Sequence, residues 1–195
     1  MENIQTNASQ QIGNSAFHRV PPKTRYNVFI NHRGADVKET LASLIYHNLQ
    51  NKGCNAFLDK KSIQVGKRIS KSIGEAMRTA AVHVAIFSAN YADSTWCLKE
   101  LYLMLKSGAP IVPVFCGVHP SELRMEYEDG QYARAFQMHK DTGKIRPQKL
   151  NKWKKALRKV SRIEGYIFQG DQGDLLEEIA TTTIKYINAA KRLKR

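Results

Sequence analysis

The segment VHVAIFSANYADSTWCLKELYLMLKSGAPIVPVF, residues 82–115, decides the fold. It opens with an apolar run interrupted by one histidine and closes with a second apolar run over residues 111–115. Between the two runs, residues 96–106 carry apolar side chains at helical spacing, and Asp93 or Ser94 is placed to cap that helix. Two strands joined by a helix form a β-α-β unit, in which the strands are parallel.

The same alternation extends outward in both directions along the chain. Apolar runs predict further strands over residues 26–30, 55–58 and 166–168. Helical periodicity predicts further helices over residues 36–51, 69–80, 130–139, 148–162 and 175–190. The first of these has an apolar stripe at Leu41, Leu44, Ile45, Tyr46 and Leu49. Pro113 lacks an N–H donor, so we expect it near a sheet edge or a bulge. The fold class is therefore α/β: a flavodoxin-like, doubly wound, five-stranded parallel sheet of order 2-1-3-4-5 with helices on both faces.

Length and composition predict one globular domain. The chain has 195 residues, of which 42% are hydrophobic and 25% charged. We expect a disordered polar leader over residues 1–22, the domain over 23–190 and a basic tail over 191–195. There is no signal peptide and no apolar stretch near the ~20 residues of a membrane span. Three widely spaced cysteines predict neither a disulfide framework nor a metal site, and a cytoplasmic location follows, with nuclear entry left open.

The net charge is strongly positive, and part of it is concentrated in one segment. The chain carries 31 Lys and Arg against 17 Asp and Glu, a formal charge of +14. One predicted helix and its approach hold no acidic residue and the following cations: Lys144, Arg146, Lys149, Lys152, Lys154, Lys155, Arg158, Lys159 and Arg162. A solvated helix face is the plainer interpretation. Binding of a polyanion such as nucleic acid is a secondary hypothesis, and it should weaken steeply with salt.

The carboxyl ends of the predicted strands are where a ligand should bind in such a sheet. The loops to consider are residues 31–38, 59–68, 88–100 and 116–124. No GxxxxGK[ST] phosphate loop, GxGxxG turn or HExxH helix occurs in the chain. A phosphoacceptor receiver shares this fold but needs clustered carboxylates after its first and third strands. Here those positions are Asn31-His32-Arg33 and Ser88-Ala89-Asn90, so receiver chemistry is excluded.

What remains is a cationic first loop and a helix that carries an indole and a carboxylate. The loop offers the binding candidates His32, Arg33, Gly34 and Lys38. Trp96 and Glu100 lie at i and i+4, and so on one helix face. A guanidinium pairs well with pyrophosphate, an indole can stack on a base, and a carboxylate can stabilise positive charge on a sugar ring. This set suits a nucleotide with a cleavable glycosidic bond.

Each of these residues also has a structural explanation. Glu100 could be a solvated helix carboxylate, and Trp96 a core residue at the start of its helix. Arg33 could form a buried ion pair with Asp36, and Lys38 could be an exposed helix cation. Cys97 is expected in the core, since nothing beside it in sequence would lower its thiol pKa.

Three blocks of the chain resemble the TIR (Toll/interleukin-1 receptor) domain of plant immune proteins. Residues 26–36, YNVFINHRGAD, are similar to the family's YDVFLSFRGED opening. Residues 86–101 are similar to its FSxNYAxSxWCLxEL block, and residues 113–124 to its PIFYxVxPSxVR segment. The resemblance covers about residues 25–188.

The resemblance implies an NAD⁺ nucleosidase, a glycohydrolase or cyclase, whose essential glutamate is Glu100. NAD⁺ would be the substrate and no cofactor would be needed, with NADP⁺ left open. Family members release nicotinamide and form ADP-ribose or cyclic ADP-ribose-type signals in plant innate immunity and cell death. The chain resembles a TIR-only protein, without nucleotide-binding or leucine-rich-repeat modules. Family members self-associate into dimers or higher oligomers and with other TIR domains, and here loop 59–68 of a neighbouring copy would complete the site.

The chain departs from the family pattern at four positions. His32 replaces a phenylalanine, Lys38 an arginine, and Val65 an arginine of the loop after the second strand. Leu44 replaces the histidine of a Ser-His pair used for self-association. The loss at Val65 keeps a second hypothesis open, a non-enzymatic adaptor that acts by TIR–TIR association. A nucleic-acid-binding TIR domain is the third.

Overall fold

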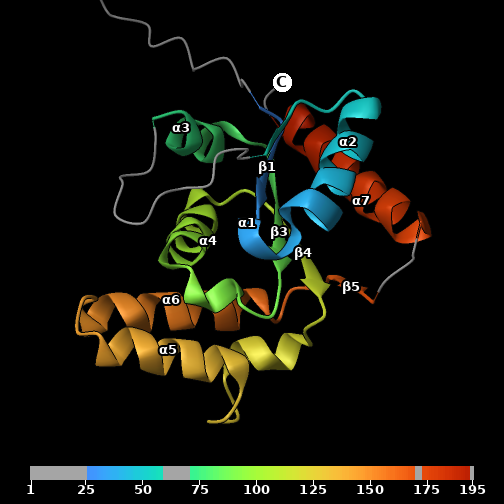
Figure 1. Cartoon of the computed structure of the whole chain (residues 1–195). Helices are drawn as coiled ribbons and strands as arrows, with labels where there is room; N and C mark the ends of the chain where they lie inside the picture. Colours follow the sequence, from blue (N-terminus) through green and yellow to red (C-terminus); the bar gives the residue numbers. More distant parts are fainter. Residues whose placement is uncertain (1–25, 59–70, 170–172, 194–195) are drawn as a thin grey trace, which may run out of the picture.

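A five-stranded parallel sheet forms the centre of the protein (Figure 1). The computed structural model describes residues 26–58, 71–169 and 173–193. The strands are β1 Val28–Asn31, β2 Ala56–Leu58, β3 Val82–Phe87, β4 Ile111–Cys116 and β5 Tyr166–Phe168. Their order is β2-β1-β3-β4-β5, and all four neighbouring pairs are parallel. The predicted fold class and strand order are confirmed.

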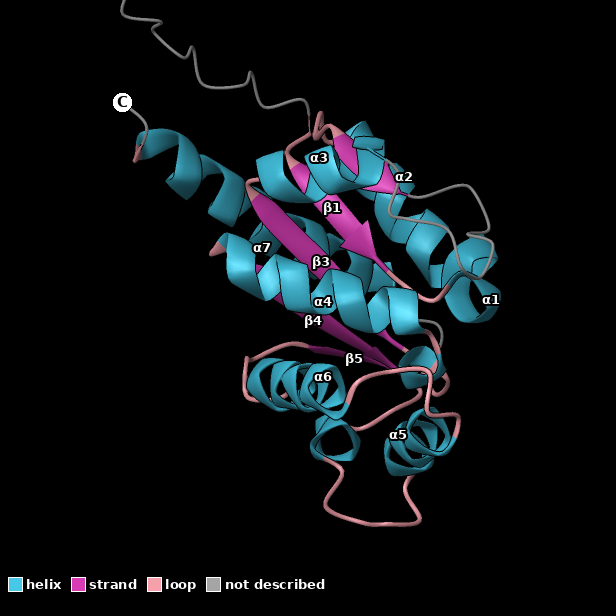
Figure 2. Cartoon of the chain, turned by 90° about the vertical axis from the view of Figure 1, so that its left-hand side faces the viewer, coloured by secondary structure: helices cyan, strands magenta, loops and turns pink. Residues whose placement is uncertain are grey.

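The helices lie on both faces of the sheet and at its carboxyl edge (Figures 1 and 2). The α-helices are α1 Gly34–Val37, α2 Ser43–Asn51, α3 Lys71–Thr79, α4 Thr95–Ser107, α5 Gln131–Asp141, α6 Pro147–Val160 and α7 Gly173–Arg192. Three further turns have other helical forms: η1 Lys38–Ala42, η2 Tyr91–Asp93 and η3 Pro120–Arg124. Helices α2 and α7 cover one face, and α3, α4 and α6 the other.

The strands divide their side chains between two hydrophobic cores. Phe29, Ala85 and Phe87 belong to the core beneath α3, α4 and α6. Val28 and Ile30 belong to the core beneath α2 and α7. Successive side chains of a strand point to opposite faces, which explains this division. By the same alternation Asn31, the last residue of β1, lies on the α4 side.

The first predicted helix, residues 36–51, is not continuous. It is divided into α1, the π-helical turn η1 and α2, with a kink at Thr40 (φ −121°, ψ −110°). The Ser43 hydroxyl donates to the carbonyl of Lys38 at 2.6 Å, and the Thr40 hydroxyl to that of Val37 at 3.3 Å. Side chains that bond backbone carbonyls in this way compete with the helical ladder. Lys38 is the first residue of η1, directly after α1.

Two side chains differ from their predicted positions. Leu44, assigned by its spacing to the buried stripe of the first helix, is 51% exposed. Pro113 lies in β4, an interior strand, so the expectation of an edge is wrong. It pairs with Ala85 of β3, while pairing with β5 begins one residue later, at Val114. On the β5 side Gly165 lies against Pro113, where an added Cβ would meet the Pro113 carbonyl oxygen at 2.6 Å.

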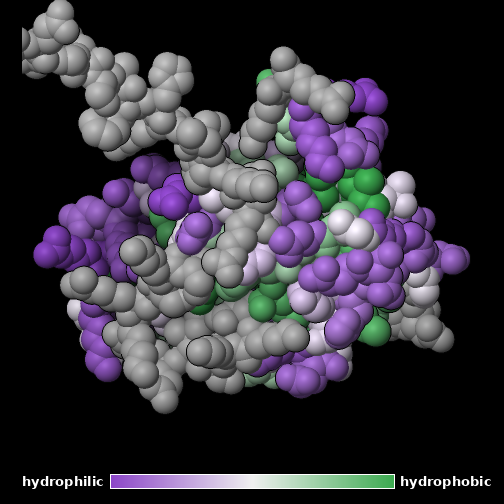
Figure 3. All heavy atoms as spheres, turned by 90° about the horizontal axis from the view of Figure 1, so that it is seen from above, coloured by the Kyte–Doolittle hydropathy of each residue, from purple (hydrophilic) through white to green (hydrophobic). Residues whose placement is uncertain are grey.

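Much of the described surface on the upper face of the molecule is hydrophilic, with small hydrophobic patches between (Figure 3). Over the residues that the structure describes, no helix is long and apolar enough to cross a membrane. The predicted leader, the loop 59–68 with Val65, and the last two residues of the basic tail lie outside the described residues.

Candidate active site

Glu100 lies in the second turn of α4, where the helix passes over the carboxyl end of β1. Its side chain is buried, with 6% of the residue exposed. The helix begins after Ser94, whose hydroxyl accepts from the backbone N–H of Cys97 at 3.3 Å. Ser94 is therefore the cap, as one of the two predicted candidates. Because the cap fixes the residue at which α4 begins, it also fixes the position of Glu100 in the second turn of the helix.

The Glu100 carboxylate accepts a hydrogen bond from Asn31, and Asn31 is in turn held by Tyr91. The amide nitrogen Nδ2 of Asn31 donates to Glu100 Oε2 at 2.7 Å. The Tyr91 hydroxyl, from η2, contacts Asn31 Oδ1 and lies 3.1 Å from the carbonyl of Cys97. Asn31 and Tyr91 are both 0% exposed. Burial raises the pKa of Tyr91 well above its ordinary value, with smaller contributions from Cys97 and Glu100, so Tyr91 is a neutral donor near neutral pH.

The first loop is tied to the end of β3 through Asp36. Asp36 forms an ion pair with Arg33, accepts from the Ser88 hydroxyl at 2.6 Å and accepts from the Asn90 backbone N–H at 3.3 Å. Burial raises the pKa of Asp36, but the hydrogen bonds from Ser88 and Arg33 and the Arg33 charge outweigh it and leave that pKa below its ordinary value. Asn90 in turn accepts from Gln131 of α5 at 2.9 Å. Loop, strand end and α5 are thus joined by one polar network.

Arg33 is accordingly part of a structural ion pair, and its side chain is still 27% exposed. Gly34 is exposed and begins α1, while Lys38 is half-buried. His32 is buried, and its carbonyl accepts from the Cys97 thiol at 3.4 Å. Burial, together with the Glu100 charge, raises the pKa of Cys97 to about 12. Cys97 is a core thiol, as predicted.

Trp96 lies in the first turn of α4 and is half-buried, outside both hydrophobic cores. The ammonium of Lys99 lies over its ring, 5.2 Å from the ring centroid. A base stacking on this ring face would have to replace Lys99. The structure thus brings Glu100 close to the first loop, and it leaves Trp96, one turn earlier in the same helix, half-buried.

The contacts of Asn31, Tyr91 and Ser88 were missed from the sequence. In the sequence, Asn31 and Ser88 stand out only as positions that lack a carboxylate. Polar residues at two strand ends of one sheet edge are a usable signal for a site. Tyr91 gives no such signal, because its partner Asn31 is distant in sequence.

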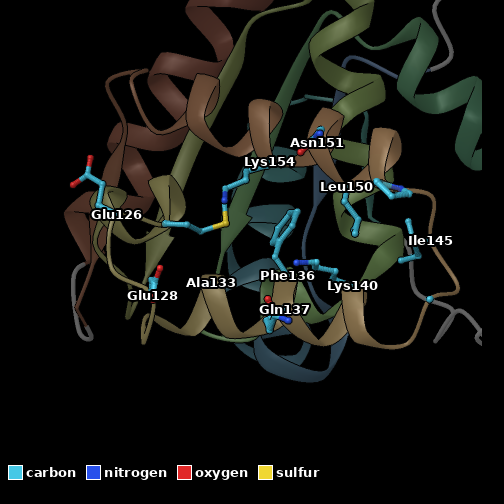
Figure 4. Close-up of a pocket in the computed structure, with 13 residues that line it drawn as sticks. Glu126, Glu128, Ala133, Phe136, Gln137, Lys140, Ile145, Leu150, Asn151 and Lys154 are labelled. Atoms are coloured by element: carbon cyan, nitrogen blue, oxygen red, sulfur yellow. The ribbon is translucent and has the colours of Figure 1, made fainter.

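A separate hollow of about 960 Å³ lies between α5 and α6 (Figure 4). Its floor is apolar, with Phe136 and Leu150, and its rim carries Glu126, Glu128 and Lys154. It contains none of the predicted site residues. Among the described residues, no group of His, Cys, Asp and Glu could hold a metal ion.

The sheet order and the buried glutamate beside the first loop define a flavodoxin-like α/β domain with a carboxylate site at the carboxyl edge of its sheet. The chain belongs to the TIR domain family, whose model matches residues 25–194. The resemblance drawn from the sequence is confirmed.

Several relatives of the chain are plant proteins. It is 37% identical over 158 residues to "Probable 2' cyclic ADP-D-ribose synthase BdTIR" of Brachypodium distachyon, covering 81% of this chain and 66% of that protein. It is 31% identical to TMV resistance protein N of Nicotiana glutinosa, covering 76% of this chain and 13% of that protein. The TIR domains of the activated Roq1 resistosome superpose with a TM-score of 0.73 at 33% identity, covering 80% of this chain and 98% of that one. The chain thus spans about two thirds of the first relative and a small part of the second.

Proposed function

We propose that the protein is an NAD⁺ nucleosidase that cleaves the nicotinamide–ribose bond and produces an immune signal. The observation that carries the proposal is the position of Glu100, a buried carboxylate hydrogen-bonded by Asn31 beside the first loop. The printed name of the BdTIR relative, a cyclic ADP-ribose synthase, supports the same chemistry.

In this mechanism Glu100 hydrogen-bonds the ribose hydroxyls and stabilises the positive charge that develops on the sugar. A carboxylate performs this best in a partly dry site, where its field is weakly screened. Nicotinamide leaves as a neutral molecule from a cationic ring, so no acid is needed to protonate it. One carboxylate therefore suffices, in contrast to the pair used by glycosidases.

The first loop and Trp96 bind the rest of the nucleotide. Arg33 keeps its ion pair with Asp36 and offers its remaining N–H donors to the pyrophosphate. Lys38 adds a second cation, and His32 and Gly34 line the loop. Trp96 stacks on a base after Lys99 moves aside. Water completes hydrolysis to ADP-ribose, and attack by the substrate's own adenine or ribose gives a cyclic product. NADP⁺ is an alternative substrate to be compared with NAD⁺.

We also propose that activity requires self-association. Leu44 of α2 and Tyr186 of α7 are exposed by 51% and 38%, on helices that pack against each other. Exposed apolar residues on one layer favour contact with a second copy. Turnover per molecule should rise with protein concentration. A monomer that keeps full turnover per molecule at high dilution would contradict this.

The test of the activity is nicotinamide release from NAD⁺ at high protein concentration, with all products separated by mass. Wild type is compared with Glu100→Gln, which preserves size and removes the charge. Glu164→Gln is the matched control, since Glu164 is exposed and outside the site. We expect turnover in wild type and control and a loss of at least a hundredfold in Glu100→Gln. Folded, assembled protein without turnover would favour the adaptor hypothesis.

A second candidate function, polyanion binding, is favoured by a groove between α4 and α6. The groove has a volume of about 610 Å³ and is lined by the cations Lys99, Arg146, Lys149 and Lys152. The ion pairs of the described residues involve none of these four cations. Arg158, by contrast, donates to the Arg124 carbonyl at 3.2 Å and helps hold η3.

This candidate is tested with a fluorescent DNA duplex. The double variant Lys149→Glu with Lys152→Glu should abolish binding and leave NAD⁺ turnover intact. The double variant Lys185→Glu with Lys191→Glu changes the net charge equally on α7 and should retain most of the binding. Binding should fall steeply with salt. Equal loss in both double variants would indicate attraction by net charge alone.

A further inference from the structure

A buried chain of hydrogen bonds connects Tyr91, Asn31 and Glu100. The three side chains come from η2, the end of β1 and α4. The Tyr91 hydroxyl contacts Asn31 Oδ1, and Asn31 Nδ2 donates to Glu100 Oε2 at 2.7 Å. All three residues are at most 6% exposed. Water therefore has little opportunity to replace any of these bonds.

The protons available to Tyr91, Asn31 and Glu100 relate the orientation of the Asn31 carboxamide to the charge of Glu100. A carboxamide has a donor end and an acceptor end. When Asn31 Oδ1 faces the Tyr91 hydroxyl, its NH₂ group must face Glu100 and favours the ionised carboxylate. The opposite orientation places Oδ1 against Glu100 Oε2, and it requires a proton on the carboxyl group.

Tyr91 decides between these two orientations. Its hydroxyl has one proton and two acceptors within reach, Asn31 Oδ1 and the Cys97 carbonyl at 3.1 Å. A proton directed at Asn31 holds the amide with its nitrogen toward Glu100. A proton directed at Cys97 makes the Tyr91 oxygen an acceptor for the turned amide. The second arrangement is consistent only with protonated Glu100.

We propose that Asn31 and Tyr91 are positioning residues that hold Glu100 as an oriented carboxylate, so that removing either one raises the pH below which the enzyme loses activity. This inference rests on the proposed function of Glu100. Asn31 fixes one carboxylate oxygen directly, and Tyr91 acts through Asn31. Neither residue needs to touch the substrate.

Other titratable groups lie near the hydrogen-bonded residues Tyr91, Asn31 and Glu100 in the part of the protein that the structure describes. Tyr91 and Cys97, two groups that interact electrostatically with Glu100, are neutral near neutral pH because burial raises the pKa of each. Arg33 is paired with Asp36, which offsets its charge. His32, the residue that follows Asn31 in the sequence, is a further titratable side chain.

The experiment measures the pKa of Glu100 directly, by ¹³C NMR of protein with labelled glutamate carboxyl groups. The Glu100→Gln variant is used to assign the signal. Tyr91→Phe should raise the Glu100 pKa by about one unit. The pH at which kcat/KM falls on the acid side of its pH profile should rise by the same amount. Asn31→Asp should move both further, because two carboxylates at this distance share a proton. Asn31→Ser shortens the side chain without adding charge and should match Tyr91→Phe.

Tyr132→Phe is the matched control. Tyr132 is also 0% exposed, and its hydroxyl donates to the Ser88 carbonyl at 2.9 Å without touching Asn31 or Glu100. It should lower stability by a similar amount and leave the Glu100 titration unchanged.

Failure of the positioning inference can be distinguished from failure of the role proposed for Glu100. If Tyr91→Phe and Asn31→Ser fold but leave the Glu100 pKa at its wild-type value, the positioning inference is wrong. If Glu100→Gln retains turnover, the catalytic role proposed for Glu100 is wrong, while the NMR titration still decides how the carboxylate is held. An equal shift in Tyr132→Phe would show general loosening of the core and would overturn the inference.

Discussion

The carboxylate of Asp36 accepts a hydrogen bond from the Ser88 hydroxyl at 2.6 Å and thereby joins the loop after β1 to the end of β3. Asp36 also holds Arg33 in an ion pair. The orientation of the expected phosphate-binding cation therefore depends on a contact between segments that are 52 residues apart. Such support is what keeps a site on loops in one geometry.

Replacing Asp36 by asparagine should weaken both substrate binding and the fold. The variant keeps the size of the side chain but loses the charge that orients Arg33. We expect unfolding free energy to fall by about 1–3 kcal/mol and KM for NAD⁺ to rise several-fold. Urea unfolding and initial rates measure the two effects. Asp174→Asn, an exposed residue at the start of α7, is the control and should change neither.

The same variant should change the acid dependence of stability. The folded pKa of Asp36 lies below its ordinary value of 3.8, so its stabilising contribution is complete above about pH 3.8 and is lost as pH falls through the folded pKa. The stability difference between wild type and Asp36→Asn should therefore shrink in strong acid. A difference that stays constant there would show that Asp36 is not held by its charge.

Replacing Trp96 by alanine should impair substrate binding more than stability, because the side chain is half-buried and outside both cores. Loss of one stacked base should raise KM by about tenfold. Tyr102→Ala is a matched control, since Tyr102 is a half-buried aromatic residue of α4 with Lys106 over its ring at 5.5 Å. If both variants raise KM equally, the effect is one of helix packing and not of stacking.

His83 should make stability depend on pH between about 6.5 and 4. It is 0% exposed, and burial lowers its pKa from 6.5 to about 4. As pH falls through this range, His83 becomes protonated in the unfolded chain but stays neutral in the folded protein. The unfolding free energy therefore decreases, by about 3 kcal/mol at most. His83→Phe should lack this slope relative to wild type. Urea unfolding at several pH values measures the difference, and parallel curves would contradict the prediction.

Gly165→Ala should destabilise the protein by about 1–3 kcal/mol. An added Cβ would meet the Pro113 carbonyl oxygen at 2.6 Å, a backbone atom that cannot move without disturbing β4. Gly173→Ala is the control, since its added Cβ would meet no described atom within 4 Å outside its neighbours and its own helix backbone. Thermal unfolding compares the two. Equal stability of the two variants would show that β5 can shift away from β4.

Sequence reasoning succeeded where the pattern is local. The apolar runs at residues 82–87 and 111–115 and the helical periodicity between them give the β-α-β unit, and Ser94 marks the start of α4. It failed at Thr40, where hydroxyls that bond backbone carbonyls interrupt a helix whose apolar spacing continues unbroken. The same spacing placed Leu44 in the core, although it lies on the surface.

The sequence by itself determined the strand order, the family and the identity of Glu100 as the candidate carboxylate, because periodicity and motifs are properties of neighbouring residues. Only the tertiary structure decided how that carboxylate is held. Asn31 lies 69 residues from Glu100 and 60 from Tyr91, and no local spacing relates them. The parallel sheet brings the end of β1 beneath α4, and burial then requires each of these polar groups to find a partner.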